Sequence, residues 1–321
     1  MVIDGHNDLA LRRWRGEPAK HLDLEAALAA GFSGGFFAMH VPSPHGGDPP
    51  ATPYAMPFAE PIPFEEAAQI TEELFETLCS LPVRRATSIH DFREGEITAI
   101  VHMEGAEAIA EDLSNLQDWY ARGLRSIGIV WSRANAFAEG VPFRFPASPD
   151  TGPGLTDAGR ALVRECNELG ILVDVSHLNE RGFWDVAEIS DRPVVATHSN
   201  AHALCASTRN LTDAQLDAIR DSGGVVGVNF AVTFLRKDGL NDFEDTGLDE
   251  IVRHVDYLVD RMGIDHVAFG SDFDGCVVPA ALGDVSGLPR LVEALRERYD
   301  ASAIDQITHG NWLRVLDATW H

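Results

Sequence analysis

Short apolar runs recur along the chain and alternate with stretches of helical, amphipathic pattern. The runs are continuously apolar, which is typical of strands that are buried on both faces of a parallel sheet. Turn-forming residues or helical stretches separate most of them. We therefore predict eight short buried strands, at Val2–Asp8, Gly35–Val41, Ile97–Gly105, Leu124–Val130, Ile171–His177, Val194–Ser199, Val225–Phe230 and Val267–Asp272.

Helices are predicted between most of these strands. Two of the predicted helices, Asp157–Leu169 and Asp213–Ser222, directly follow a threonine, Thr156 and Thr212. Threonine is a residue type that favours helix N-caps. Strand and helix alternate about eight times, which predicts an α/β fold of the (β/α)8 TIM-barrel type, with residues 1–321 as a single domain. An open, doubly wound sheet is the alternative, but no G-x-G-x-x-G follows the first strand.

The connections have different lengths at the two ends of the predicted strands. Those that lead from helix back to strand are short, whereas three that leave strands are long, at about 42–63, 141–153 and 233–247. In barrel enzymes the strand-to-helix loops surround the active site, so we expect the site at that end. The proline-rich segment 42–63 is as consistent with a lid as with surface packing or a contact between the subunits of a homodimer.

Composition narrows the set of partners. The chain has 25 Lys+Arg against 50 Asp+Glu, a formal net charge of −25, which repels the phosphates of nucleic acids and anionic lipids. No apolar run reaches the roughly 20 residues of a membrane helix, and no signal segment precedes the first strand. We therefore expect a cytoplasmic protein that binds a small molecule, with no nucleic-acid partner and no membrane association.

Histidine and acidic residues stand at the carboxyl ends of five predicted strands. His6 and Asp8 lie two positions apart on the first strand, so both side chains face the same side. A single histidine in such a place is more often structural than a ligand. Several buried charges together are costly unless they are paired or bound to a metal, so the set predicts a metal site. The residues that end the third, fifth, sixth and eighth strands are Glu104, His177, His198 and Asp272.

Imidazole and carboxylate ligands without thiolate suit Zn²⁺, with Mn²⁺, Fe²⁺ and Co²⁺ as alternatives. The four cysteines form no C-x-x-C pair. Five ligands exceed the needs of one tetrahedral ion, so we expect two ions, ~3.5–4 Å apart, that share a carboxylate and a hydroxide. A carboxylated lysine bridges the two ions in some binuclear barrels, but neither Lys20 nor Lys237 ends a predicted strand. We therefore expect Glu104 to be the bridging group.

Seven short motifs, spread from residue 4 to residue 315, contain these residues and several others. They are Asp4-Gly5-His6-Asn7-Asp8, Met103-Glu104-Gly105, Val175-Ser176-His177, Thr197-His198-Ser199-Asn200-Ala201, Arg209-Asn210, Gly270-Ser271-Asp272-Phe273-Asp274-Gly275 and Gly310-Asn311-Trp312-Leu313-Arg314-Val315. In this order the motifs resemble the renal or membrane dipeptidase family, the M19 branch of the amidohydrolase superfamily. The resemblance implies a zinc-dependent barrel that hydrolyses the peptide bond of dipeptides.

The resemblance also implies a role for each metal ligand. His6 and Asp8 would hold one zinc ion, and His177 and His198 would hold the other. Glu104 would bridge the two zinc ions of each chain.

The remaining implied roles concern proton transfer and substrate binding. Asp272 would be the acid/base residue beside a metal-bridging hydroxide, and Arg209 would bind the C-terminal carboxylate of the substrate. The sequence departs from the family at Trp131, where many members have a histidine that polarises the substrate carbonyl. Trp131 therefore either lines the substrate pocket, which we favour, or packs in the barrel core.

Two other functions remain open on the sequence alone. The same metal chemistry would suit an N-acyl amino acid, a small lactam or another amide that carries a carboxylate, and the change at Trp131 favours this alternative mildly. The second alternative is a protein that binds metal in the barrel but does not catalyse a reaction. Such a protein would not need an acid/base residue, so the presence of Asp272 argues against this alternative.

Overall fold

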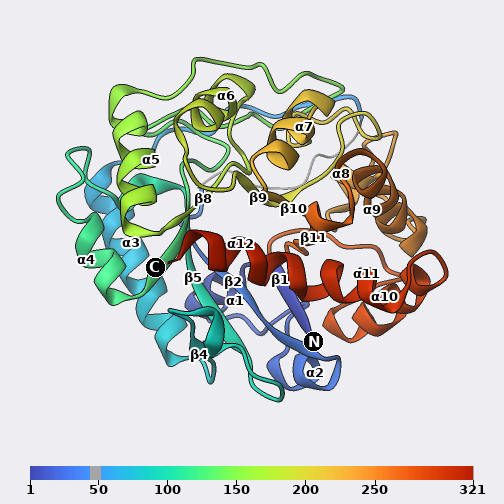
Figure 1. Ribbon diagram of the computed structural model, residues 1–321. Helices are drawn as coiled ribbons and strands as arrows, with labels where there is room; N and C mark the ends of the chain where they lie inside the picture. The colour runs from blue at the N-terminus through green and yellow to red at the C-terminus, as the bar shows by residue number, and fades with distance from the viewer. Residues whose placement is uncertain (44–51, 321) are drawn as a thin grey trace.

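Parallel strands form the inner wall of the molecule, and helices surround them (Figure 1). In the computed structural model, which describes residues 1–43 and 52–320, eight strands follow one another in the order β1-β2-β5-β6-β8-β9-β10-β11. The predicted (β/α)8 barrel is confirmed, and the doubly wound sheet is wrong. The strands are β1 (Val2–Asn7), β2 (Phe32–His40), β5 (Thr98–Glu104), β6 (Leu124–Gly128), β8 (Leu172–Asp174), β9 (Val195–Ser199), β10 (Val225–Val228) and β11 (Val267–Phe269).

The two ends of the sheet meet and close the barrel. A parallel bridge joins Asn7 to Phe273, and the amide of Asp8 donates to the carbonyl of Phe273 at 2.8 Å. The carboxylate of Asp4 accepts hydrogen bonds from the amide and the hydroxyl of Ser271, each at 2.7 Å. These contacts bring together residues that are 267 positions apart in the chain.

The helices begin and end where the local sequence predicts. The hydroxyl of Thr156 accepts from the amide of Gly159 at 3.0 Å and caps α5, and Thr212 forms a capping box with Gln215 at the start of α7. The helices are α1 (Leu9–Trp14), α2 (Leu24–Ala29), α3 (Phe64–Ser80), α4 (Leu116–Arg122), α5 (Asp157–Leu169), α6 (Glu180–Ile189), α7 (Asp213–Asp221), α8 (Val232–Leu235), α9 (Leu248–Met262), α10 (Leu288–Arg296), α11 (Ala301–Asp305) and α12 (Asn311–Thr319).

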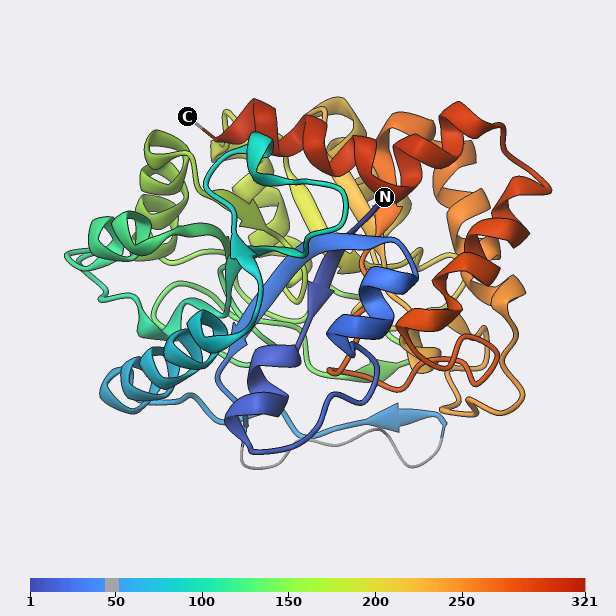
Figure 2. The same cartoon turned by 90° about the horizontal axis from the view of Figure 1, so that it is seen from below.

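Helix α12 lies across the amino end of the barrel (Figures 1 and 2). It supplies a large side chain, Trp312, to the interior. Trp312 is fully buried, and its indole N–H donates to the carbonyl of Phe269 at 2.9 Å. A Cβ at Gly5 would lie 2.6 Å from the indole ring and one at Gly227 would lie 3.0 Å from it, so the ring depends on both glycines. Side chains from seven strands pack in the same cluster: Ile3, Phe36, Ile100, Leu172, Val195, Val225 and Ala268.

Two of the long connections meet at the opposite end. Strand β3 (Tyr54–Ala55) pairs antiparallel with β7 (Arg144–Phe145), so the predicted loops 42–63 and 141–153 are joined to each other. In Figure 2 strand β3 lies at the end of the barrel away from α12. Residues 44–51 of the first loop lie outside the described residues. A further two-residue strand, β4 (Arg84–Arg85), pairs in parallel with the first two residues of β5, outside the path of the eight strands.

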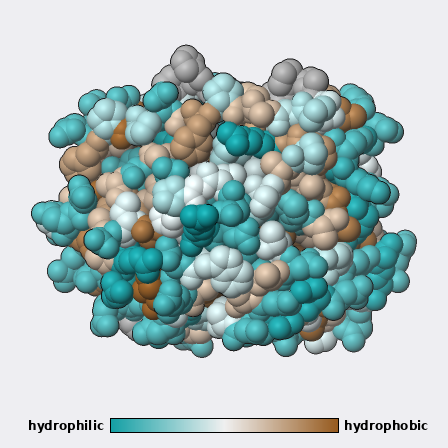
Figure 3. All heavy atoms as spheres, turned by 90° about the horizontal axis from the view of Figure 1, so that it is seen from above, coloured by the Kyte–Doolittle hydropathy of each residue, from teal (hydrophilic) through white to brown (hydrophobic). Residues whose placement is uncertain are grey.

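The surface is largely hydrophilic on the face that Figure 3 shows, and apolar side chains occur there in separate small groups. Among residues 1–43 and 52–320, no helix has the combination of length and apolarity that a membrane crossing requires.

A buried histidine on α9 ties two loops of the carboxyl end together. His254 Nδ1 accepts from the amide of Ala201 at 3.2 Å, and its Nε2–H donates to the carbonyl of Leu235 at 2.9 Å. Ala201 follows strand β9, which carries His198. Both hydrogen bonds require a neutral imidazole, and burial lowers the pKa of His254 to about 3.

This pKa predicts a specific acid sensitivity. The unfolded chain binds a proton at His254 below a pH of about 6.5, whereas the folded chain does not until about pH 3, so stability falls as the pH decreases through this range, by ~1.4 kcal/mol per pH unit. We expect the free energy of unfolding of His254→Gln to fall less steeply than that of the wild type between pH 6.5 and 4.5. Urea unfolding at several pH values measures both slopes, and parallel slopes would contradict the assignment.

Candidate functional site

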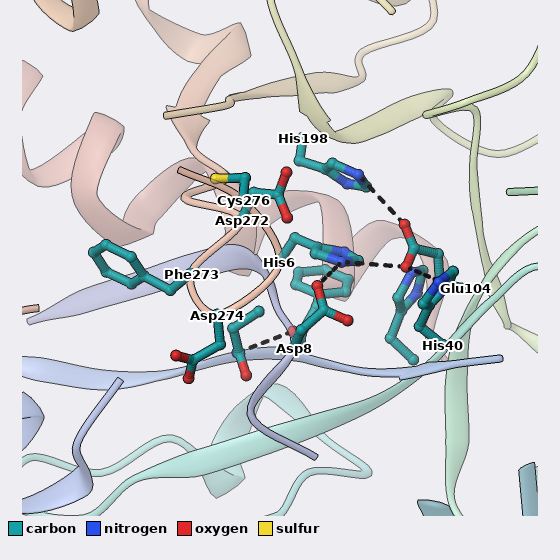
Figure 4. Close-up of polar contacts among 12 residues, drawn as sticks. His6, Asp8, His40, Glu104, His198, Asp272, Phe273, Asp274 and Cys276 are labelled. Atoms are coloured by element: carbon teal, nitrogen blue, oxygen red, sulfur yellow. Dashed lines mark hydrogen bonds and ion pairs between the residues drawn. The ribbon is translucent and has the colours of Figure 1, made fainter. Parts of the chain in front are cut away.

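The carboxylate of Glu104 lies at the centre of the carboxyl end of the barrel, surrounded by imidazoles (Figure 4). Its Oε1 is 3.1 Å from Nε2 of His177 and 3.5 Å from Nε2 of His198. Its Oε2 is 3.6 Å from Nε2 of His6 and 3.1 Å from Nδ1 of His40. All five side chains are buried. Imidazoles from three strands, β1, β2 and β9, and from the turn after β8 therefore converge on one carboxylate of β5.

A second group of acidic side chains extends from His6 toward β11. Nε2 of His6 is 3.5 Å from Oδ2 of Asp8, and one ligand atom from each of His6, Asp8 and Asp272 falls within 4.8 Å of the others. A Cβ at Gly275 would lie 2.1 Å from the Asp8 carboxylate and 2.5 Å from that of Asp272. The absence of a side chain at Gly275 thus allows both carboxylates to reach the centre.

The donor atoms of this centre fit a bound cation. Both ring nitrogens of His6 and Oδ1 of Asp8 are buried without a hydrogen-bond partner, a costly arrangement in a folded protein. The ligand atoms of His6, Glu104 and His198 also lie within 4.8 Å of one another. Imidazole nitrogens and carboxylate oxygens at these separations are the donor set that zinc-class ions prefer.

Neighbouring hydroxyls orient two of the imidazoles. Ser132 Oγ lies 2.8 Å from Nδ1 of His177, and Thr197 Oγ1 lies 2.8 Å from Nδ1 of His198. The Thr197 hydroxyl in turn donates to Asp174 at 2.6 Å. Because each Nδ1 is engaged, each Nε2 is directed to Glu104, as metal-binding histidines require.

Two of these side chains project from turns rather than from strands. The sequence predicted that His177 and Asp272 end strands, but β8 and β11 stop three residues earlier. His177 has a φ of 67° and Asp272 a φ of 59°, in the left-handed region that side chains other than glycine adopt rarely. Such strain is concentrated at functional sites, and here it turns both side chains inward.

The site also favours positive charge. Burial alone would lower the pKa of His6, but the carboxylates of Glu104, Asp8 and Asp272 raise it to about 10. Burial raises the pKa of Asp272 to about 7, and the nearby Asp8 and Glu104 contribute to the rise against the opposing effect of His6. Around His6, the negative charge of Asp8, Glu104 and Asp272 therefore exceeds the positive charge of the nearby side chains.

The guanidinium of Arg209 is buried beside this centre without a carboxylate partner. It donates to the carbonyl of His198 at 3.0 Å and to the hydroxyl of Ser199 at 3.4 Å, and its Nε has no partner. It lies 5.6 Å from the ring of Phe234. Burial lowers the pKa of Arg209, although Asp272 and other acidic groups oppose this. A buried guanidinium of this kind suits a carboxylate from outside the chain.

The ring of Trp131 lies at the site rather than in the apolar interior. Its centroid is 5.1 Å from that of His40, 5.7 Å from that of His177 and 5.5 Å from that of Phe143. Trp131 is half-buried, whereas the side chains of the barrel interior are fully buried. This position is compatible with the pocket interpretation.

Sequence reasoning missed some neighbours of the site. His40 lies at the end of the second predicted strand, so the rule that singled out the predicted ligands applied to it as well. Phe143 and Phe234 stack on each other, with centroids 6.1 Å apart. Phe143 lies in the long connection 141–153 and Phe234 in α8, and the sequence does not reveal that these segments meet. Asp274, which shares a motif with Asp272, accepts from the amides of residues 20 and 21 and holds that loop.

Comparisons with known proteins agree with one another on the family of this chain. The family model described as membrane dipeptidase (peptidase family M19) matches residues 1–320. The structure is similar to that of a metallo peptidase from Rhodobacter sphaeroides liganded with a phosphinate mimic of the dipeptide L-Ala-D-Ala, with a TM-score of 0.96, 47% identity and 99% of each chain covered.

Two relatives known from sequence are also similar. An uncharacterized protein from the pqqA 5′ region of Klebsiella pneumoniae is 56% identical over 73% of this chain and 87% of its own length. Dipeptidase verJ of Clonostachys rogersoniana is 30% identical over 99% of this chain and 84% of its own length.

Proposed function

The chain belongs to the membrane dipeptidase family and is a metal-dependent dipeptidase, and on this basis we propose that it uses two zinc ions to hydrolyse dipeptides with a free C-terminal carboxylate. The observation that carries the proposal is the convergence of imidazoles on both oxygens of Glu104. A relative 47% identical is liganded with a phosphinate dipeptide mimic, which supports a dipeptide as the substrate.

We assign the ligands by the oxygen of Glu104 that each one faces. His6 and Asp8 hold one ion on the Oε2 side, His177 and His198 hold the other on the Oε1 side, and Glu104 serves both. When bound, the two ions would polarise the scissile carbonyl and lower the pKa of a water molecule that attacks it.

Asp272 transfers the proton in this proposal. Asn229 Nδ2 donates to Oδ2 of Asp272 at 3.0 Å and fixes the orientation of the carboxylate. Oδ1 is then available to accept a proton from the attacking water and to deliver it to the leaving amine. The left-handed turn at Asp272 and the close approach of Gly275 keep this carboxylate beside Asp8.

Arg209 selects substrates by the position of their carboxylate. Its guanidinium is held by the backbone and hydroxyl of β9, the strand that carries His198, so the distance from guanidinium to metal ligands is set by one rigid element. A substrate whose carboxylate is blocked, or is separated from the scissile bond by further residues, cannot satisfy both ends. Trp131, beside His40 and His177, lines the substrate pocket and narrows it.

Metal analysis tests the two-ion assignment. The zinc-replete protein should contain close to two ions per chain, and Glu104→Gln should lower the occupancy of both positions, because a neutral amide replaces a carboxylate that serves two ions. Elemental analysis of dialysed protein measures this. One ion or fewer in the wild type would rule out the binuclear assignment.

Turnover of Asp272→Asn tests the proton-transfer role. The amide oxygen can still accept from Asn229 but cannot take up the proton, so kcat should fall by about 10²–10⁴ with unchanged metal content. Asp274→Asn is the matched control, since Asp274 also lies in a left-handed turn, with a φ of 69°, but holds a loop. Near-normal turnover of Asp272→Asn, or an equal loss in the control, would refute the role.

Substrates with free and amidated carboxyl ends test Arg209. Arg209→Lys should raise KM for a free dipeptide, because an ammonium cannot replace the planar bidentate guanidinium. The amidated dipeptide, already a poor substrate of the wild type, should be affected much less. An equal proportional loss of kcat/KM on both substrates would show that Arg209 supports the site without contacting the carboxylate.

A further inference from the structure

One of the four imidazoles around Glu104 has no role in the proposed metal site. Nδ1 of His40 lies 3.1 Å from Oε2 of Glu104, as close as any imidazole in the centre, and the side chain is 10% exposed. His40 and Glu104 are paired residues on the adjacent parallel strands β2 and β5, so the backbone itself holds the two side chains next to each other.

The contacts of His40 differ from those of the proposed ligands. His6 contacts Asp8 as well as Glu104, and Nε2 of His177 lies 3.1 Å from Nε2 of His198, so each ligand approaches another ligand. His40 makes one ion-pair contact in the described part of the chain, to Oε2 of Glu104, and its Nδ1 is otherwise buried without a hydrogen-bond partner. This difference indicates a group that acts on the carboxylate and not on the metal.

The surroundings hold His40 in place. The ring of Trp131 packs against the His40 imidazole, with centroids 5.1 Å apart. The next residue, Val41, accepts a hydrogen bond through its carbonyl from the buried Arg133 at 2.9 Å, and Arg133 is ion-paired with Glu107 at 2.7 Å. The loop that follows Glu104 is thus tied directly to the end of the strand that carries His40.

We propose that His40 is a positioning residue, whose imidazole, with Nδ1 3.1 Å from Oε2 of Glu104, restrains the plane of the bridging carboxylate. A carboxylate that must serve two ions needs a defined rotation about its side-chain bonds, and His177 and His198 restrain only Oε1. His40 supplies the restraint on Oε2, next to His6. Partners of this kind typically affect metal affinity by about 10–100-fold when removed. This inference rests on the metal site proposed above.

The test is a zinc titration against a competing chromophoric chelator. His40→Phe removes the donor and should weaken zinc binding by about 10–100-fold, with two ions still bound at saturation. His40→Asn keeps an N–H near the position of Nδ1 and should restore affinity close to that of the wild type. Trp131→Phe, which keeps an aromatic ring against His40, is the control for a local packing change and should bind zinc as the wild type does.

Two further measurements separate the outcomes. The melting temperature of the chelator-treated proteins should be similar for His40→Phe and His40→Asn, so that a difference in affinity does not reflect folding. The visible spectrum of the Co²⁺-loaded protein should keep its shape in His40→Phe, because the ligand set is unchanged.

Unchanged affinity in His40→Phe would overturn the proposal. Binding of one ion at saturation, or an altered Co²⁺ spectrum, would also overturn it, because His40 would then be a ligand. If the wild type itself bound no zinc in the same titration, the proposed function and not this inference alone would fail.

Discussion

The burial of the Glu104 carboxylate is the constraint on which the carboxyl end of the barrel depends. A carboxylate withdrawn from water is tolerable only with positive charge or hydrogen-bond donors around it, and here strands β1, β2 and β9 and the turn after β8 supply imidazoles. Hydroxyls and carboxylates behind the imidazoles orient them in turn, as Ser132 does for His177. The positions of β1, β2, β9 and the turn after β8 therefore have to satisfy the charge of one acidic side chain.

The two ends of the barrel meet different physical demands. At the amino end, the Trp312 ring and the apolar side chains around it fill the interior, and Gly5 leaves room for the ring. Stability there comes from packing. At the carboxyl end, left-handed turns at His177 and Asp272 store strain that the packed end must offset.

The sequence revealed the architecture more fully than the details of the site. Continuously apolar runs identified all eight strands because burial on both faces leaves a clear pattern, and polar residues at their ends pointed to Glu104 and to three of the four imidazoles around it. The runs did not show that β8 and β11 end before His177 and Asp272, because a left-handed turn has no hydrophobic signature. The stacking of Phe143 on Phe234 arises where the connection 141–153 packs against α8, which depends on the whole fold.

The bridge between Asn7 and Phe273 has a consequence for biosynthesis. Strand β1 is synthesised before the other seven strands of the barrel, whereas the segment that pairs with it on one side, Ser271–Phe273, follows all of them, and contacts of such long sequence separation form slowly. Until then His6 and Asp8 stand on an unpaired strand edge, without the segment that carries Asp272. Incorporation of metal with the full set of side chains therefore has to follow closure of the barrel, late in or after translation.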